Sequence, residues 1–112
     1  MKPDPNRFLP LAPATLHILL ALAAEDLHGY GIMQEVERQS EGRFRLGPGT
    51  LYDNLARLVR DGLVAEAGEE ARRRYYRLTA SGRRLLTAEI ARLETVVRDA
   101  RASLGKAMPG RT

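Results

Sequence analysis

The C-terminal part of this 112-residue chain carries an apolar repeat that is longer than a small domain needs. Its members alternate spacings of four and three residues, the heptad pattern of helices that pack against a partner helix: Leu86, Ile90, Leu93, Val97, Ala100 and Leu104. Thr79 is a suitable N-cap and Gly105 a suitable stop, so we expect one helix from Ala80 to Leu104. About 25 residues at 1.5 Å each reach roughly 37 Å, more than so short a chain needs to cover its own core.

The excess length leaves two interpretations of this repeat. Its proximal part, Leu85 and Leu86 above all, can cover the first helix of the same chain. The distal part extends beyond such a neighbour, so we expect it to pair with the same helix of a second copy. Residues 80–105 are therefore predicted to be a dimerisation helix, followed by a C-terminal tail at 106–112.

The stretch from Gly47 to Gly62 is typical of a short helix with a marked start and stop. Pro48 fits the first helical position, where its missing N–H costs nothing, and Gly62 supplies the left-handed residue that closes a helix. Residues at helical spacing form a stripe that we expect to face the core: Leu51, Leu55 and Leu58. The other sides carry small, hydrogen-bonding and basic residues: Gly49, Thr50, Tyr52, Asp53, Arg57 and Arg60.

The remaining segments complete the fold class. We expect an N-terminal tail at 1–12, helices at 13–24 and 30–40, strands at 63–67 and 73–78, and a loop at 68–72 between the strands. In the second strand, Tyr76 and Leu78 fall on the face that packs on the helices. The pattern predicts a mainly α fold with a small β-ribbon: a winged helix-turn-helix at 13–79 and a long C-terminal helix.

Composition narrows the function classes. The net charge is +4, the sequence pI is near 10.0, and the positive residues are nearly all arginine, which favours a polyanionic partner. The absence of cysteine excludes a disulfide framework and a thiolate metal site. The nearby prolines argue against the apolar run 16–24 as a signal peptide. The run is also too short to span a bilayer. We expect a cytoplasmic chain with no membrane association.

The two histidines, His17 and His28, invite a metal or catalytic interpretation. Neither has a second histidine, a cysteine or a carboxylate cluster at ligand spacing, so we expect no metal, no cofactor and no catalytic residues. His28 instead is expected to organise the turn before Tyr30. The glycine pairs near residues 29 and 47 match neither a dinucleotide fingerprint nor a phosphate-binding P-loop. The sequence therefore favours a binding protein over an enzyme.

Four blocks in order resemble the PadR-like transcriptional regulators. They are His-Gly-Tyr-Gly-Ile at 28–32, Pro-Gly-Thr-Leu-Tyr at 48–52, Leu55, Leu58, Gly62 and Leu63, and Arg-Arg-Tyr-Tyr-Arg-Leu-Thr at 73–79 with Gly82 and Arg83. The resemblance implies a homodimeric repressor whose third helix enters the major groove and whose wing touches the DNA backbone. It also implies release by a small hydrophobic or phenolic effector. The single terminal helix resembles the short branch of the family.

The candidate DNA contacts follow from this arrangement. Thr50, Tyr52 and Arg57 can reach base edges from a recognition helix, although a solvated helix face is the alternative. Asp53 can accept from a cytosine amino group or simply favour the positive end of the helix. Three wing residues can anchor phosphates or form an ordinary charged hairpin: Arg72, Arg73 and Arg74.

Two departures from the family pattern support a second hypothesis. Asp53-Asn54 stands where relatives more often carry proline and a small residue, and the wing loop holds Glu69 and Glu70. Carboxylates repel phosphates, so the alternative is a winged-helix protein interaction module with incidental DNA affinity. The leading hypothesis is a dimeric regulator, with two recognition helices about 34 Å apart on a palindromic operator of double-stranded DNA.

Overall fold

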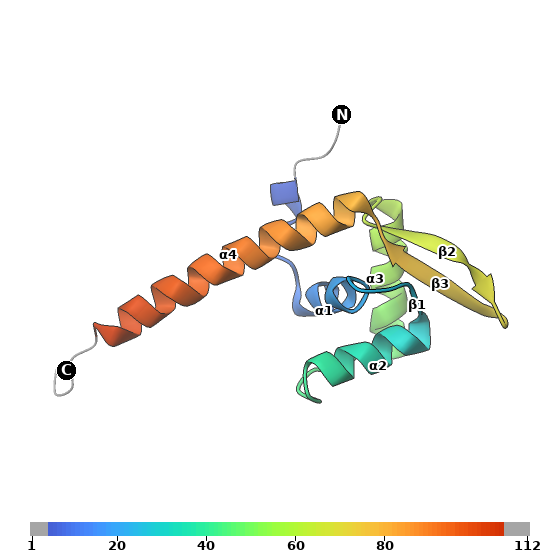
Figure 1. Cartoon of the computed structure of the whole chain (residues 1–112), viewed down its shortest axis with the longest axis horizontal. Helices are drawn as coiled ribbons and strands as arrows, with labels where there is room; N and C mark the ends of the chain where they lie inside the picture. The colour runs from blue at the N-terminus through green and yellow to red at the C-terminus, as the bar shows by residue number, and fades with distance from the viewer. Residues whose placement is uncertain (1–4, 107–112) are drawn as a thin grey trace.

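A computed structural model describes residues 5–106 as a small helical body with a β-wing on one side and a projecting helix on the other (Figure 1). The elements are η1 (Pro5–Phe8), α1 (Pro13–Ala21), β1 (Leu27–His28), α2 (Gly29–Gln39), α3 (Pro48–Arg60), β2 (Val64–Glu70), β3 (Arg73–Leu78) and α4 (Ala80–Gly105). The molecule measures 61 × 38 × 22 Å, and α4 accounts for much of the longest dimension. The predicted order of three helices, a ribbon and a long helix is confirmed.

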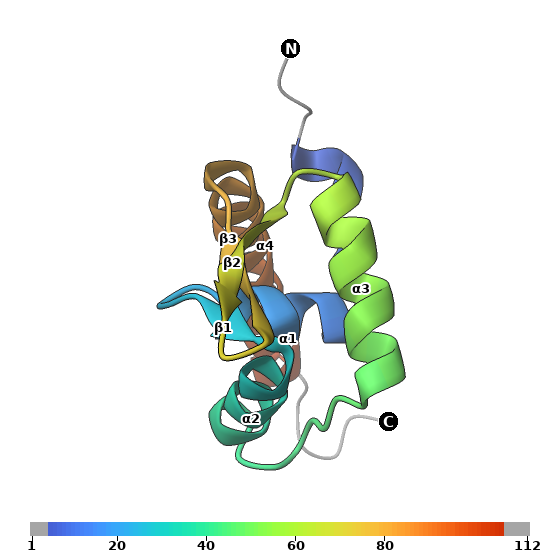
Figure 2. The ribbon, with the colours of Figure 1, turned by 90° about the vertical axis from the view of Figure 1, so that its right-hand side faces the viewer.

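The core forms around α1, which lies between α3 and the strands (Figure 2). Apolar side chains cover most of this nine-residue helix, and Ile18 and Leu19 are fully buried, as expected of a helix enclosed on several sides. The stripe predicted on α3 is confirmed, because Leu51, Leu55 and Leu58 are all buried. α3 is therefore fixed by one face and leaves the others free.

The predicted start and stop of α3 and the predicted N-cap of α4 are also confirmed. Pro48 occupies the first turn of α3, and Gly62 has a φ of +74°, in the left-handed region that glycine enters without a Cβ penalty. The Thr79 hydroxyl accepts a hydrogen bond from the Gly82 N–H at 3.0 Å, which caps α4. A Cβ on Gly82 would collide with the Leu63 carbonyl oxygen, so this glycine allows α4 to start directly against the chain leading into β2.

The wing differs from the prediction in two respects. The sheet has three antiparallel strands in the order β1-β3-β2, because Leu27 and His28 pair with Tyr76 and Tyr75. A two-residue strand carries no periodic signal, so the sequence could not reveal it. The ribbon is also longer than expected, since β2 runs to Glu70 and the turn has positive φ at its two central residues, as a tight two-residue hairpin requires.

The N-terminal segment is a correction. Residues 5–12, which we expected to belong to a tail, pack on α4 through η1, and Phe8 and Leu11 are partly buried against the core. The Leu11 N–H donates to Glu89 Oε2 at 2.8 Å. The remainder of the expected tails, 1–4 and 107–112, lies outside the described residues.

The first helix is shorter than expected. It ends at Ala21 rather than Ala24, and Leu22 forms its C-cap while remaining buried. Apolar side chains continue past the helix end because the turn itself is covered by the core. The apolar pattern therefore predicted correctly that Leu22 is buried, and predicted the C-terminal end of the helix incorrectly.

Candidate nucleic-acid interface

The exposed side of α3 presents the predicted contact residues near its N-terminus. Thr50, Tyr52, Asp53 and Arg57 are all solvent-exposed, and the helix starts freely at Pro48. The first turns of α3 are therefore open to a partner, as a recognition helix must be.

Tyr52 links α3 to α2. Its side chain lies over Gly29, where any added Cβ would collide with the phenol, and the residue is still 49% exposed. A side chain at position 29 would therefore displace the Tyr52 phenol from this position. Tyr52 packs on the start of α2 while keeping much of its surface free for a partner.

Arg57 is held differently from the other predicted contacts. Its Nη2 donates to Asn54 Oδ1 at 2.7 Å, and the same oxygen accepts from Thr15 Oγ1 at 2.7 Å. Asn54 is 5% exposed and its own Nδ2 donates to the Thr50 carbonyl at 2.8 Å. The guanidinium therefore leans toward α1, beside a hollow lined by Phe8 among other residues, instead of toward the wing.

Asn54 is a residue whose role the sequence analysis missed. It joins α1 to α3 and positions Arg57 through hydrogen bonds. Its place three residues after Leu51 and four before Leu58, on the buried stripe, is a signal that could have found it. A polar side chain on a core-facing stripe needs partners there.

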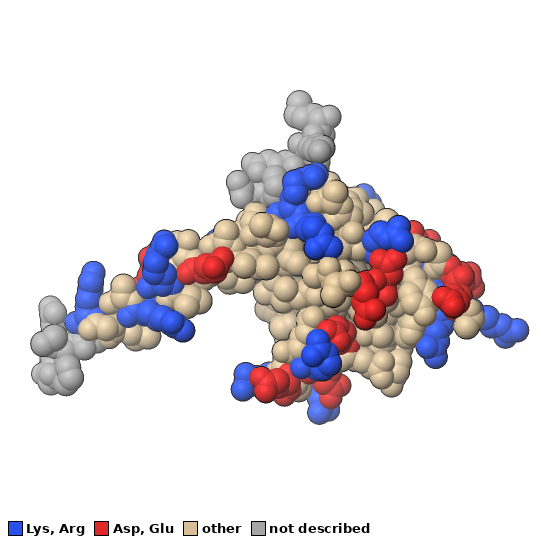
Figure 3. All heavy atoms as spheres, viewed as in Figure 1, with Lys and Arg blue, Asp and Glu red and all other residues tan. Residues whose placement is uncertain are grey.

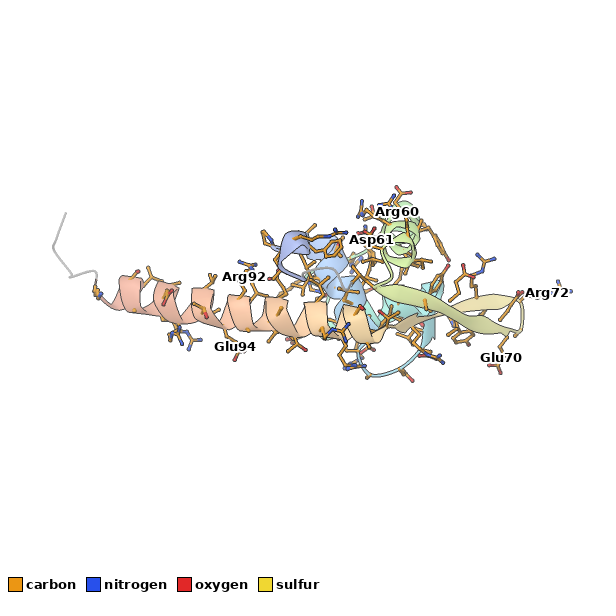
Figure 4. All side chains as sticks on the ribbon, turned by 90° about the horizontal axis from the view of Figure 1, so that it is seen from above. Arg60, Asp61, Glu70, Arg72, Arg92 and Glu94 are labelled. Atoms are coloured by element: carbon orange, nitrogen blue, oxygen red, sulfur yellow. The ribbon has the colours of Figure 1, made fainter. Side chains whose placement is uncertain are left out.

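The three wing arginines and Tyr52 gather around one cleft of about 430 Å³ between the wing and the start of α2. Its lining consists of His28, Gly29, Tyr30, Tyr52, Glu69, Arg72, Arg73, Arg74 and Tyr76. Figure 4 shows Arg72 at the tip of the wing, and Figure 3 shows basic side chains at that end of the molecule. Thr50 and Arg57 are not part of this lining, so the predicted site residues divide between the cleft and the exposed side of α3.

The charges in the cleft are mixed but mainly positive. Arg74 lies 3.5 Å from Glu66 in an exposed ion pair. In the β2–β3 ladder, Glu69 lies opposite Arg74 and Glu70 lies opposite Arg73. Exposed pairs of this kind contribute little energy and can rearrange when a stronger anion approaches. Burial raises the pKa of the Tyr76 phenol, partly offset by Arg74, so this side chain stays a neutral donor at the cleft floor.

The predicted dimerisation residues do not form one uninterrupted surface. Leu86 is 5% exposed in the core of its own chain, which corrects its assignment to the dimer face. Ile90, Val97 and Leu104 are exposed, Ala100 is exposed, and Leu93 is half-buried. This side of the helix carries apolar and charged side chains together: Ile90, Leu93, Glu94, Val97, Arg98 and Arg101.

Residues 5–106 carry neither a metal-binding cluster nor a membrane-spanning helix. No group of three His, Cys, Asp or Glu side chains there could hold a metal ion. No helix in the same range combines the length and apolarity needed to cross a membrane.

His28 acts as predicted in the turn before Tyr30, because its Nδ1 accepts from the Gly31 N–H at 3.0 Å.

Two relatives can be compared along the sequence. An uncharacterized 37.1 kDa protein in transposon TN4556 of Streptomyces fradiae is 46% identical over 76 residues, which cover 68% of this chain but 21% of that protein. Transcriptional regulator Rv3488 of Mycobacterium tuberculosis is 38% identical over 91 residues, which cover 79% of this chain and 82% of the regulator. The chain therefore spans about a fifth of the first relative and most of the second.

Two solved structures share the fold. A transcriptional regulator from Clostridium thermocellum, Cth-833, matches with a TM-score of 0.71 at 28% identity, covering 80% of this chain and 87% of that one. Bacillus subtilis PadR in complex with operator DNA matches with a TM-score of 0.62 at 22% identity, covering 72% of this chain and 48% of that one. Both likenesses confirm the winged-helix fold class with its long C-terminal helix.

The family is shown by the sequence itself. The profile described as Transcriptional regulator PadR-like family matches residues 18–88, which is more than half of the chain. The match contains all of the four blocks noted in the sequence, from His28 to Arg83. This chain belongs to the PadR-like family of transcriptional regulators.

Proposed function

We propose that this regulator binds double-stranded DNA as a homodimer, with α3 in the major groove and the wing on the adjacent backbone. The observation that carries the proposal is the cleft in which Tyr52 from α3 lies beside Arg72, Arg73 and Arg74 from the wing. A surface of this kind places groove-reading groups next to phosphate anchors. The Bacillus subtilis relative that shares the fold is itself bound to operator DNA.

The contacts divide into two classes. Thr50, Tyr52 and Asp53 are exposed at the start of α3 and are proposed to read bases. The wing arginines are proposed to hold phosphates, which fixes register and carries no sequence information. Arg57 spends one donor on Asn54 and stays exposed, so we propose that its remaining donors contact DNA beside α3.

The dimer is proposed to form through the distal half of α4. Ile90, Leu93, Val97, Ala100 and Leu104 supply the surface, without Leu86. A heptad repeat exposed along several turns favours a second helix of the same pattern. Two subunits would place two recognition helices about one DNA turn, ~34 Å, apart, which predicts a palindromic operator.

The finer functional assignments extend the family resemblance. We propose that the dimer represses by occupying a promoter and that a small hydrophobic or phenolic molecule releases it. We propose that such a molecule acts between subunits, at the side of the distal arm that carries Ile90, Leu93 and Val97. A repressor of this kind works beside the chromosome, so we place it in the cytoplasm and assign it no catalytic role.

The direct test is a binding measurement. The purified chain is titrated with a duplex from its own upstream region and with a scrambled duplex of equal length, across a salt series. We expect a preference of at least ~10³ for the upstream duplex and a steep log–log salt dependence, because several phosphates are neutralised.

A second outcome would favour the alternative function. Weak binding that ignores sequence and disappears at physiological salt would mean that the wing acids, Glu69 and Glu70, keep DNA away. The exposed face and the arm would then serve a protein partner, and DNA affinity would be incidental.

A further inference from the structure

The contact between His28 and Arg73 contains a conflict between donors. Arg73 Nη1 lies 3.0 Å from His28 Nε2, and the Gly31 N–H lies 3.0 Å from His28 Nδ1. A guanidinium and a backbone N–H can only donate, whereas a neutral imidazole has one donor and one acceptor nitrogen. In either tautomer, one of the two contacts therefore joins two donors.

The helix cap decides which contact is left unsatisfied. The Gly31 N–H is fixed in the first turn of α2, where it needs an acceptor. Arg73 is exposed and its side chain can move. The cap therefore selects the tautomer with an unprotonated Nδ1, and the Nε2–H group and the Arg73 guanidinium are left as two donors 3.0 Å apart.

The imidazole is held rigidly in this position. His28 pairs with Tyr75 in the β1–β3 ladder, and the Tyr75 ring meets the imidazole edge-on with centroids 5.2 Å apart. The cap, the ladder and the aromatic contact together fix the ring. A fixed donor binds an acceptor at a lower entropy cost than a mobile one.

We infer that His28 Nε2–H and the Arg73 guanidinium together bind one phosphate of the DNA backbone. A phosphate oxygen accepts from both donors and removes the conflict between them. Arg72 and Arg74 line the same cleft, and Glu69 is the carboxylate that opposes an anion there. This inference rests on the proposed DNA-binding function and adds His28, the last residue of β1 and the N-cap of α2, to the contacts proposed for the wing arginines.

The test uses a substitution that keeps the cap. In the full-length His28→Asn variant, the amide oxygen still accepts from Gly31 N–H, but the donor at Nε2 is gone. At about pH 8, we expect about tenfold weaker binding to upstream and scrambled duplexes alike. The salt slope stays unchanged, because no charge has been removed from the protein.

The Arg73→Gln variant gives a different signature at the same site. Its binding also weakens on both duplexes, and its salt slope falls by about 0.9, the value for one released counterion. The double variant is expected to lose less than the product of the two single losses, because both donors serve one acceptor. Arg38→Gln removes the same charge from the far part of α2 and serves as the control, with affinity within about twofold of wild type.

Neutral methylphosphonates introduced one at a time locate the phosphate. We expect one position per half-site where the replacement weakens wild type but has little further effect on either variant. Wild-type affinity in a folded His28→Asn protein would overturn the inference while leaving DNA binding by the chain intact. Absence of DNA binding by the wild-type protein would instead reject the proposed function. If His28→Asn does not fold, the methylphosphonate series is measured on wild type and on Arg73→Gln. The site is overturned if no single methylphosphonate weakens binding by wild type more than binding by Arg73→Gln.

Discussion

The two halves of α4 share one apolar repeat but have opposite environments. In the proximal half, Leu85 and Leu86 are 0% and 5% exposed and belong to the core of the chain. In the distal half, Val97 and Leu104 are 48% and 75% exposed. A heptad repeat thus marks a helix face suited to packing, and the extent of the body decides where the same chain covers that face and where it stays exposed.

The boundary between the halves is marked by a buried charge. Glu89 is 1% exposed, accepts from the Leu11 N–H, and pairs with Arg92 at 2.5 and 3.1 Å. Figure 4 shows Arg92 and Glu94 on opposite sides of α4. Beyond Leu93, every described residue of the helix is exposed. The N-terminal segment therefore sets the point at which α4 leaves the body.

Charges in the distal half should have the largest effect. The Ile90→Glu/Val97→Glu variant places two carboxylates per subunit in the proposed interface, which should weaken self-association by at least about 10³-fold, or about 4 kcal/mol. Sedimentation measures it. Ala91→Glu/Thr95→Glu adds the same charge on the other side of α4 and should stay dimeric. A dimer that survives in the first variant would remove the arm from the interface.

Truncating a leucine should separate the two halves next, in a protomer kept monomeric by Ile90→Glu/Val97→Glu. Leu85→Ala empties a fully buried site and should lower the free energy of unfolding by about 3 kcal/mol, whereas Leu104→Ala should change it by less than about 1 kcal/mol. Denaturant titrations at one protein concentration provide both values. Equal losses would show that the distal half is as deeply buried as the core.

The smallest effect is expected at the boundary and depends on pH. Hydrogen bonding from Arg92 lowers the pKa of Glu89 below its ordinary 4.5, burial opposes this, and the Leu11 amide adds to it. A carboxyl with a lowered pKa stabilises the fold above that ordinary value and loses the contribution as pH falls through its folded pKa. Glu89→Gln should therefore cost about 1 to 2 kcal/mol at neutral pH, discounted because Arg92 is partly solvated.

Unfolding curves from neutral to acid pH check this linkage. The difference between wild type and Glu89→Gln should shrink below about pH 4.5, where the wild-type carboxyl is also becoming protonated. Glu70→Gln at the exposed wing tip should change stability by less than about 0.5 kcal/mol throughout. A difference that grows toward acid pH would mean that Glu89 is destabilising when charged.

Local signals in the sequence were sufficient for most elements and for several caps. Pro48, Gly62 and Thr79 act within a few residues of the chain, so their roles follow from backbone chemistry alone. The site was predictable to the same extent: exposed residues on α3 and the wing arginines occupy the expected elements. The division of these residues between the cleft and the exposed side of α3 could not be predicted. Tyr52 lines the cleft beside the wing, whereas Arg57 donates to Asn54.

By itself, the sequence determined the order of the main helices and strands, the buried stripe of α3, the apolar repeat of α4 and the family. These properties are periodic or local, so they can be counted along the chain. The tertiary structure alone decided the strand at Leu27–His28, the docking of Leu11 on Glu89 and the meeting of His28 with Arg73. Each joins residues more than 40 positions apart, and such pairs depend on how the whole core closes.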